Sequence, residues 1–183
     1  MSGRRWLALT AMALSAQCLA QAQAQAQAQC HIAFDAARAE LGELRRPLAA
    51  PPAWLELPQR LHVLTATCQP GAAMVVNFVG MPRQQGFAFG SDGDVQLRVA
   101  QALLDGQPVE LQTLEAAEPG QGGADLRVVR PGDRLVAVRD GTPLQGAQLV
   151  LHLISTPRLR PAQFNVREQR TVEASLAVHV STY

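Results

Sequence analysis

The chain contains no lysine: all sixteen of its basic residues are arginine. Fifteen acidic residues nearly balance them, and the formal net charge at pH 7 is +1. The arginines form neither a run nor a basic stripe. Proteins that bind nucleic acids draw much of their affinity from such a basic surface. We therefore expect no nucleic acid among the partners.

Aromatic residues are also scarce, with five Phe, two Trp and one Tyr among 183 residues. The core must therefore be built mainly from Val, Leu and Ala. Hydrophobic residues make up 48% of the chain and charged residues 17%, which is an ordinary globular composition of a length that suits one domain. The scarcity of aromatics counts against a sugar-binding surface made of stacked rings. Trp6 lies in the N-terminal segment that is interpreted below as a signal peptide, which leaves Trp54 as the single Trp of the mature chain.

The sequence lacks the motifs Gly-x-Ser-x-Gly and His-Glu-x-x-His and has no phosphate-binding loop. Asp92 and Asp94 flank Gly93, but a calcium loop needs more oxygen ligands at fixed offsets, so we interpret this stretch as a turn. We expect no enzymatic activity, no cofactor and no metal site. The four histidines lie in or beside alternating strand patterns, which favours surface or structural roles: His31, His62, His152 and His179.

Residues 1–22 have the features of a secretory signal peptide. A charged start precedes an apolar run too short to span a bilayer, and small residues at the end offer a cleavage site. Cys18 follows Gln where a lipoprotein signal has Gly or Ala, which argues against lipidation. Residues 23–29 are a low-complexity Gln-Ala segment, and we expect one folded domain over 30–183. The protein is therefore expected to be exported.

Removal of the signal peptide leaves two cysteines, Cys30 and Cys68. An even pair in an exported protein implies a disulfide bond. The alternative is a metal site that adds His31 and His62, but the spacing matches no zinc motif.

Short apolar segments with alternating polarity follow one another from residue 30 onwards, separated by Gly, Pro and Asp turns. Asp105-Gly106 predicts the turn of a hairpin that runs from Val95 to Leu114. The segments predicted as strands are 30–34, 61–68, 74–79, 86–93, 95–103, 109–113, 126–130, 135–138 and 149–154. This pattern predicts an all-β sandwich.

Other segments give further expectations. Residues 35–46 fit either a helix capped by Asp35 or an irregular segment, and residues 48–58 should form an extended connection because they are rich in proline. Residues 69–71 are predicted to form a turn, and Pro157 and Pro161 are expected to interrupt the strand that precedes them.

The last thirteen residues, Thr171 to Tyr183, predict a long strand with one buried face. It holds no Gly or Pro, and a strand of this kind at a chain end is prone to aggregation unless it is paired. The residues on the expected buried face are Val172, Ala174, Leu176, Val178 and Val180.

Together these features resemble the subunits of bacterial chaperone–usher fimbriae. The features are a signal peptide, a Cys near the start of the mature chain, a second Cys about forty residues later, a Val-Val-Asn-Phe-Val-Gly strand just after it, a β-rich body and an alternating final strand that ends in Tyr. The Gly- and Asp-rich middle looks like an uncharacterised fimbrial-like branch of that family.

The resemblance implies an immunoglobulin-like (pilin-type) β-sandwich that lacks one strand and leaves a hydrophobic groove beside its final strand. A periplasmic chaperone fills such a groove, and an outer-membrane usher lets the N-terminal extension of a neighbouring subunit replace it by β-augmentation. By this resemblance, Val172, Ala174, Leu176, Val178 and Val180 line the groove, and the carboxylate of Tyr183 is held by basic residues of the chaperone. The protein would pass through the periplasm to a fimbrium at the cell surface.

The chain departs from the family pattern at both ends. Tyr183 is the last residue rather than the penultimate one, and it is out of phase with Val180. Only residues 23–29 precede Cys30, whereas filling a groove takes an alternating strand of about ten residues at ~3.3 Å each. The chain would then accept a strand without donating one, as suits a tip or minor adhesive subunit. The alternative function is a self-complete exported β-sandwich that binds a ligand.

Overall fold

The computed structural model describes residues 28–45, 53–84, 86–114, 127–165 and 168–183. Within these ranges the chain is all-β apart from one short 3₁₀ helix, η1 (Pro161–Phe164). The strands are β1 (Gln29–Phe34), β2 (Leu55–Glu56), β3 (Arg60–Ala72), β4 (Met74–Gly80), β5 (Pro82–Arg83), β6 (Gly86–Phe89), β7 (Gly93–Leu104), β8 (Gln107–Pro108), β9 (Glu110–Thr113), β10 (Arg127–Val129), β11 (Arg134–Arg139), β12 (Thr142–Pro143), β13 (Gly146–Leu159) and β14 (Leu176–Thr182).

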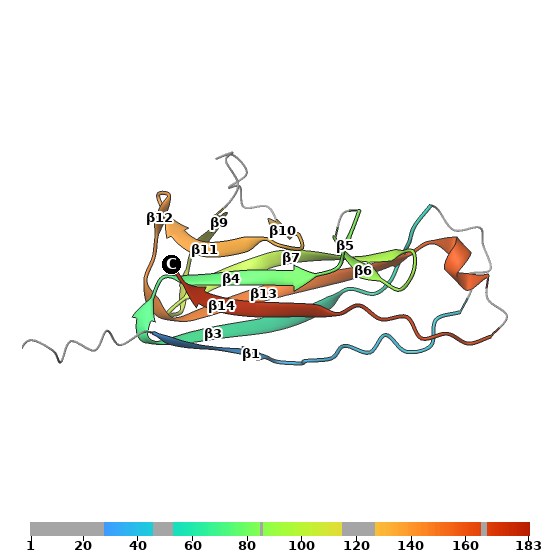
Figure 1. The fold of residues 1–183 in the computed structure, drawn as a ribbon, viewed down its shortest axis with the longest axis horizontal. Helices are drawn as coiled ribbons and strands as arrows, with labels where there is room; N and C mark the ends of the chain where they lie inside the picture. Colours follow the sequence, from blue (N-terminus) through green and yellow to red (C-terminus); the bar gives the residue numbers. More distant parts are fainter. Residues whose placement is uncertain (1–27, 46–52, 85, 115–126, 166–167) are drawn as a thin grey trace, which may run out of the picture.

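The strands form two antiparallel sheets, which run along an elongated molecule (Figure 1). The larger sheet has the order β1-β3-β13-β7-β6-β5, and β2, β8 and β10 pair with its members at the sides. The smaller sheet has the order β12-β11-β4-β14, and β9 also pairs with β11. The chain therefore places its first strand at one edge of the larger sheet and its last strand at one edge of the smaller sheet.

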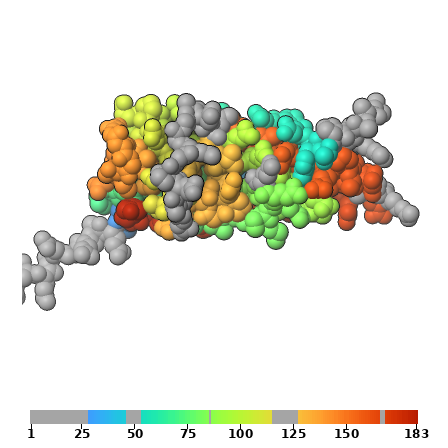
Figure 2. Space-filling model, turned by 90° about the horizontal axis from the view of Figure 1, so that it is seen from above, coloured from blue at the N-terminus to red at the C-terminus, as the bar shows by residue number. Residues whose placement is uncertain are grey.

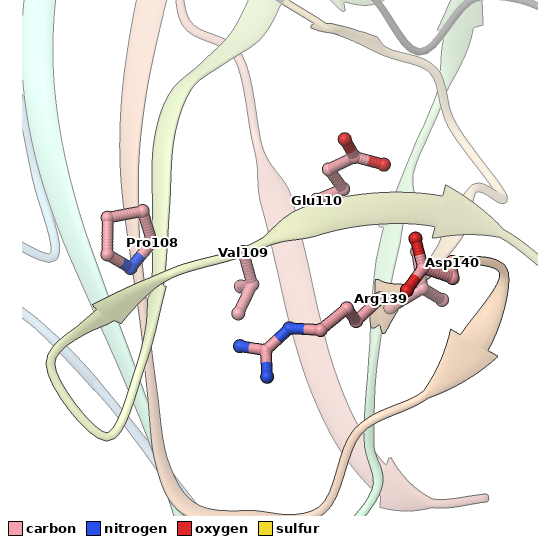
Figure 3. Close-up of a pocket in the computed structure, with 6 residues that line it drawn as sticks. Pro108, Val109, Glu110, Arg139 and Asp140 are labelled. Carbon is pink, nitrogen blue, oxygen red and sulfur yellow. The ribbon is translucent and has the colours of Figure 1, made fainter.

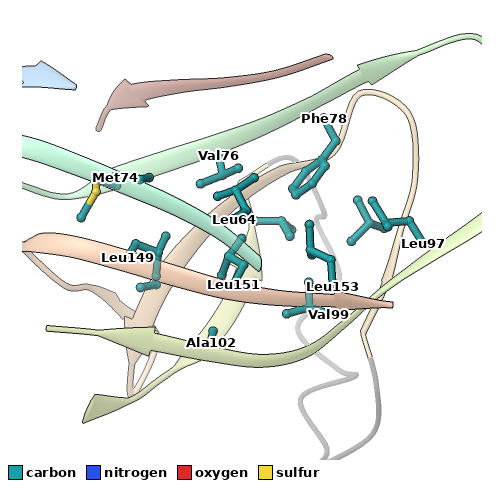
Figure 4. Close-up of a cluster of buried hydrophobic side chains, with 14 of the residues drawn as sticks. Leu64, Met74, Val76, Phe78, Leu97, Val99, Ala102, Leu149, Leu151 and Leu153 are labelled. Atoms are coloured by element: carbon teal, nitrogen blue, oxygen red, sulfur yellow. The ribbon is translucent and has the colours of Figure 1, made fainter. Parts of the chain in front are cut away.

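Side chains from both sheets meet in one apolar core (Figure 4). Alternate residues of β13, Leu149, Leu151 and Leu153, point into it, and β4 contributes Val76 and Phe78 from the other sheet. Full burial of such a side chain stabilises the fold by roughly 1.5–3 kcal/mol. Aliphatic residues dominate, as the scarcity of aromatics predicts; the members with no exposed surface are Leu64, Ala66, Cys68, Val76, Phe78, Val129, Leu135, Leu149 and Leu151.

Two of the predicted strands lie in the interior of their sheets. The segment predicted over 74–79 is β4, which lies between β11 and β14, and the segment predicted over 149–154 belongs to β13, which lies between β3 and β7. The all-β class predicted from the turn spacing is confirmed as well. The expected signal peptide, Cys18 and most of the Gln-Ala segment lie outside the described residues.

Two predicted interruptions are wrong. Residues 69–71 form no turn, because β3 continues through the cis Gln69–Pro70 peptide bond to Ala72, where it pairs with Gly146. Pro157 stays within β13 opposite Val95. The Pro157 carbonyl oxygen accepts a hydrogen bond of 2.8 Å from the Leu57 amide. The N–H and C=O groups of a strand residue point to the same side, so the N–H that Pro157 lacks would face the end of the short strand β2.

The hairpin prediction is half right. Asp105 and Gly106 form the turn with positive φ values of 48° and 80°, as the Asp-Gly pair indicates. The returning arm pairs with β7 only over β8, and it then crosses to the smaller sheet as β9. The proline in β8 cannot donate to the β7 ladder, which favours this early departure.

Residues 35–45 form no helix, so the helical alternative for this segment is wrong. Leu41 and Leu44, whose spacing suggested a helix face, pack instead at one end of the molecule against a second apolar cluster. Its buried members are Leu57, Phe89 and Leu159. In the space-filling view, the segment around residue 57 and the end of β13 lie against each other at that end (Figure 2).

Candidate functional site

The edge strands β1 and β14 lie next to each other although they belong to different sheets (Figure 1). Within the described ranges, β1 pairs only with β3 and β14 pairs only with β4. The two strands run in opposite directions (Figure 1). A strand inserted between them would therefore run parallel to one and antiparallel to the other.

Backbone hydrogen bonds show which groups of each strand face the open side. The Tyr183 amide donates to the Ala73 carbonyl at 2.8 Å, and the Asp35 amide donates to the Val63 carbonyl at 3.0 Å. Bonded and non-bonded pairs alternate in an antiparallel ladder, so odd-numbered residues of both strands bond inward. The amides and carbonyls of the even-numbered residues therefore point to the open edge.

The side chains of the same even-numbered residues face the core. Val178 and Val180 of β14 and Ile32 and Phe34 of β1 pack against the main cluster, yet each is only half-buried. Leu176 is 38% exposed, whereas Phe78, which lies opposite Val178 on β4, is fully buried. The core is thus closed within each sheet and is least covered along β1 and β14, the two adjacent edges that we call the open edge.

The predicted strand at the end of the chain is shorter than expected. Strand β14 begins at Leu176 rather than at Thr171. Val172 packs instead into the second apolar cluster and lies close to Gly90, where an added Cβ would come within 2.7 Å of its Cγ1 atom. The Gly90 amide also donates to the Glu173 carbonyl at 3.0 Å. These two contacts tie residues 172–173 to the loop after β6.

Among the residues predicted to line a groove, the structure brings Leu176, Val178 and Val180 to the open edge. Ala174 precedes the strand and is exposed. Tyr183 extends the pairing with β4 by one residue, and its side chain is 73% exposed.

The disulfide between Cys30 and Cys68 is confirmed, and it joins β1 to β3 at directly opposed positions. The alternative metal site is thereby excluded, because neither sulfur is available as a thiolate ligand. His62 lies within 2.9 Å of the Ser155 hydroxyl, which makes it a structural residue. No group of three or more metal-binding side chains occurs in the described part of the chain.

Two surface hollows occur in the described part of the chain. The larger, about 330 Å³, lies between the β8–β9 and β11–β12 segments and is lined by Val109, Glu110, Val138, Arg139 and other residues (Figure 3). The guanidinium of Arg139 points away from the carboxylates of Glu110 and Asp140 (Figure 3). A smaller hollow of about 160 Å³ lies over β1 and β3.

A buried ion pair is the feature that the sequence analysis missed. Asp94, which was interpreted as part of a turn, lies in β7 with no exposed surface. It accepts two hydrogen bonds from Arg158 of β13, at 2.7 Å from Nε and 2.6 Å from a terminal nitrogen. The hydrogen bond to Asp94 raises the pKa of Arg158 above its ordinary value, against the opposing effect of burial. The two residues are 64 positions apart, so no local pattern could have paired them.

Trp54 lies over the same arginine. Its ring centroid is 4.9 Å from the guanidinium carbon of Arg158 and 4.8 Å from that of Arg160. Both distances are within the range of a cation–π contact. The indole therefore links the segment before β2 to the end of β13.

No known family model matches the chain, and no curated protein matches its sequence. Within the described ranges, no helix is long and apolar enough to cross a membrane.

Proposed function

We propose that this protein is an exported fimbrial or fimbrial-like subunit whose β-sandwich is completed by a strand from another chain. The added strand would lie at the open edge between β1 and β14. The observation that carries the proposal is the juxtaposition of two unpartnered edges whose core-facing side chains are only half-buried.

The strand order supports the immunoglobulin-like, pilin-type part of the proposal. The path β1-β3-β13-β7 opposite β14-β4-β11 is the order that we would expect of such a sandwich without its last strand. The added strand would pair with β14 and extend the smaller sheet. The known subunits of chaperone–usher fimbriae receive that strand first from a periplasmic chaperone and then from a neighbouring subunit, after transfer at the outer-membrane usher.

The open edge also suits strand addition energetically. The even-numbered residues of β14 offer backbone groups along the edge, and these supply affinity to an incoming strand. Every second side chain of that strand would cover Leu176, Val178 and Val180, which gives the interaction its register. An edge of this kind on an isolated protein is prone to aggregation, so a partner that covers it also protects it.

The N-terminal sequence supports a terminal place in a fibre. Residues 23–29 contain only Gln and Ala, and an alanine side chain buries little apolar surface. The chain would then accept a strand and be unable to complete a neighbour, as in a tip or minor subunit. Purified protein that forms fibres by itself would contradict this part of the proposal.

The test is thermal unfolding with a synthetic peptide of about ten residues in which apolar residues alternate with polar ones. At a peptide concentration of 100 times Kd, binding stabilises the native state by about 2.7 kcal/mol. For a chain of this size the melting temperature then rises by about 5–10 °C. A peptide of identical composition in shuffled order is the control, and it should give no shift.

The opposite result would favour the second function considered from the sequence. A protein that is soluble and monomeric without a chaperone, and that no alternating peptide stabilises, has a complete sandwich and is a ligand-binding module.

A further inference from the structure

We propose a binding site for an organic carboxylate at Trp54 and Arg160, at the end of β13. This site lies apart from the open edge, and it does not depend on the function proposed above. The ligand class is a carboxylate attached to a carrier with a flat apolar face, such as a sugar acid or an aromatic acid.

The first argument is the state of Arg160. Its side chain is exposed, and its guanidinium carbon lies 4.8 Å from the centroid of the Trp54 ring. A guanidinium that stacks on a ring keeps its in-plane N–H groups for a ligand, and these can hold a carboxylate through two parallel hydrogen bonds. In the described part of the chain, no acidic side chain lies within 4.0 Å of this guanidinium.

The second argument is the contrast with Arg158. That guanidinium contacts the same indole, but its charge is already satisfied by the buried Asp94. The ion pair fixes Arg158 and thereby fixes the ring that Arg160 stacks on. Arg158 is thus a positioning residue, and Arg160 is the cation that remains for a ligand.

The third argument is the support beneath the ring. Arg158 lies opposite Glu56 of β2, and Leu159, which follows it, lies opposite Leu55. Leu159 and Leu57 are buried members of the second apolar cluster. Trp54 precedes this anchored strand directly and is itself half-exposed. The Arg160 cation is therefore held over the Trp54 ring on a rigid base, where its planar donors can hold a carboxylate.

The experiment is an NMR titration of the full chain, in which the indole N–H signal of Trp54 is followed. The signal is assigned with W54F, because the chain has a second Trp. The probes are sodium D-glucuronate and sodium benzoate, and the neutral controls are glucose and benzyl alcohol. We expect saturable shifts with at least one acid, at least tenfold weaker binding of its neutral control, and weaker binding at higher salt.

Variants locate the site. R160Q should weaken binding of the acid at least tenfold, and R160K should weaken it less, because lysine keeps the charge and loses the planar donor pair. R139Q, which removes an exposed arginine at the far hollow, should bind as the unchanged protein does. Equal melting temperatures show that the variants are folded.

Each outcome decides the proposal. Binding of glucuronate alone identifies a sugar-acid site, and binding of benzoate alone identifies an aromatic-acid site. The proposal is overturned if neither acid binds up to about 20 mM, a limit that corresponds to a negligible affinity. Equal binding of acid and neutral control, or unchanged binding by R160Q, would also overturn it.

Discussion

The buried pair of Asp94 and Arg158 gives the sharpest prediction about stability. Asp94→Ala leaves a guanidinium that is only 8% exposed without the carboxylate that now accepts hydrogen bonds of 2.7 and 2.6 Å. Removal of one partner of a buried pair costs about 3–5 kcal/mol, because the remaining charge keeps its desolvation cost and loses the carboxylate that offsets it. Domains of this kind have a total stability of about 5–15 kcal/mol, so this single change removes a large part of it.

Urea denaturation measures this loss of unfolding free energy. In thermal unfolding, the same loss should lower the melting temperature by about 6–20 °C for a chain of this length. The control is Glu40→Ala, which breaks the exposed pair with Arg38 at 3.7 Å and should cost at most about 1 kcal/mol. The double variant D94L/R158M replaces both charges with apolar groups and should recover most of the loss. The reasoning is refuted if D94A costs less than about 1 kcal/mol, or if the double variant is no more stable than D94A.

Three further predictions concern the covalent and backbone features of the fold. The double variant C30A/C68A should lose about 4 kcal/mol of unfolding free energy, because the disulfide closes a loop with a sequence separation of 38 in the unfolded chain; a loss below about 1 kcal/mol would contradict this. Gly86→Ala should cost about 3 kcal/mol of unfolding free energy, because the added Cβ would lie 2.1 Å from the Val95 carbonyl oxygen. Gly106→Ala, in open space at φ +80°, should cost about 1 kcal/mol. Equal losses for the two variants in chemical denaturation would argue against the clash. The hydrogen bond with the Val63 backbone lowers the pKa of Asp35, so this group contributes stability above its ordinary pKa and loses it as the pH falls through the folded value. Asp35→Asn should therefore reduce the fall in melting temperature between pH 5 and pH 2, and an unchanged fall would contradict the assignment.

The sequence predicted the features that repeat over short distances. Short apolar segments predicted the strands that are now β4 and β13, and an Asp-Gly pair located the turn after β7. Cysteine count, taken with the signal peptide, predicted the disulfide that joins β1 to β3. Each of these signals depends on neighbouring residues or on the number of cysteines. They can therefore be recognised without knowing where the rest of the chain lies.

Features that depend on distant partners were not predictable. Pro157 remains in β13 because β2 ends beside it, and Val172 leaves the final strand because it packs near Gly90. Asp94 has the local context of a turn and becomes a buried ion-pair partner only once β7 and β13 are side by side. In each case tertiary packing overrides the local pattern.

The candidate site was predicted in part by alternating polarity. It placed Val178 and Val180 on the core-facing side of the last strand, and the structure leaves them half-buried next to β1. Nothing in the sequence could show that the neighbouring strand β1 belongs to the other sheet. The open edge is therefore a property of the assembled fold, and its role in strand addition stays a proposal.

Amide hydrogen exchange along β14, followed by NMR, tests the central claim most directly. The account predicts that the amides of Leu176, Val178 and Val180 exchange rapidly in the isolated protein, while those of Ala177 and His179 are protected by β4. Addition of the alternating peptide should protect the even-numbered amides and leave the odd-numbered ones as they were. If the even-numbered amides are already protected in the isolated protein, the edge is closed and the account is wrong.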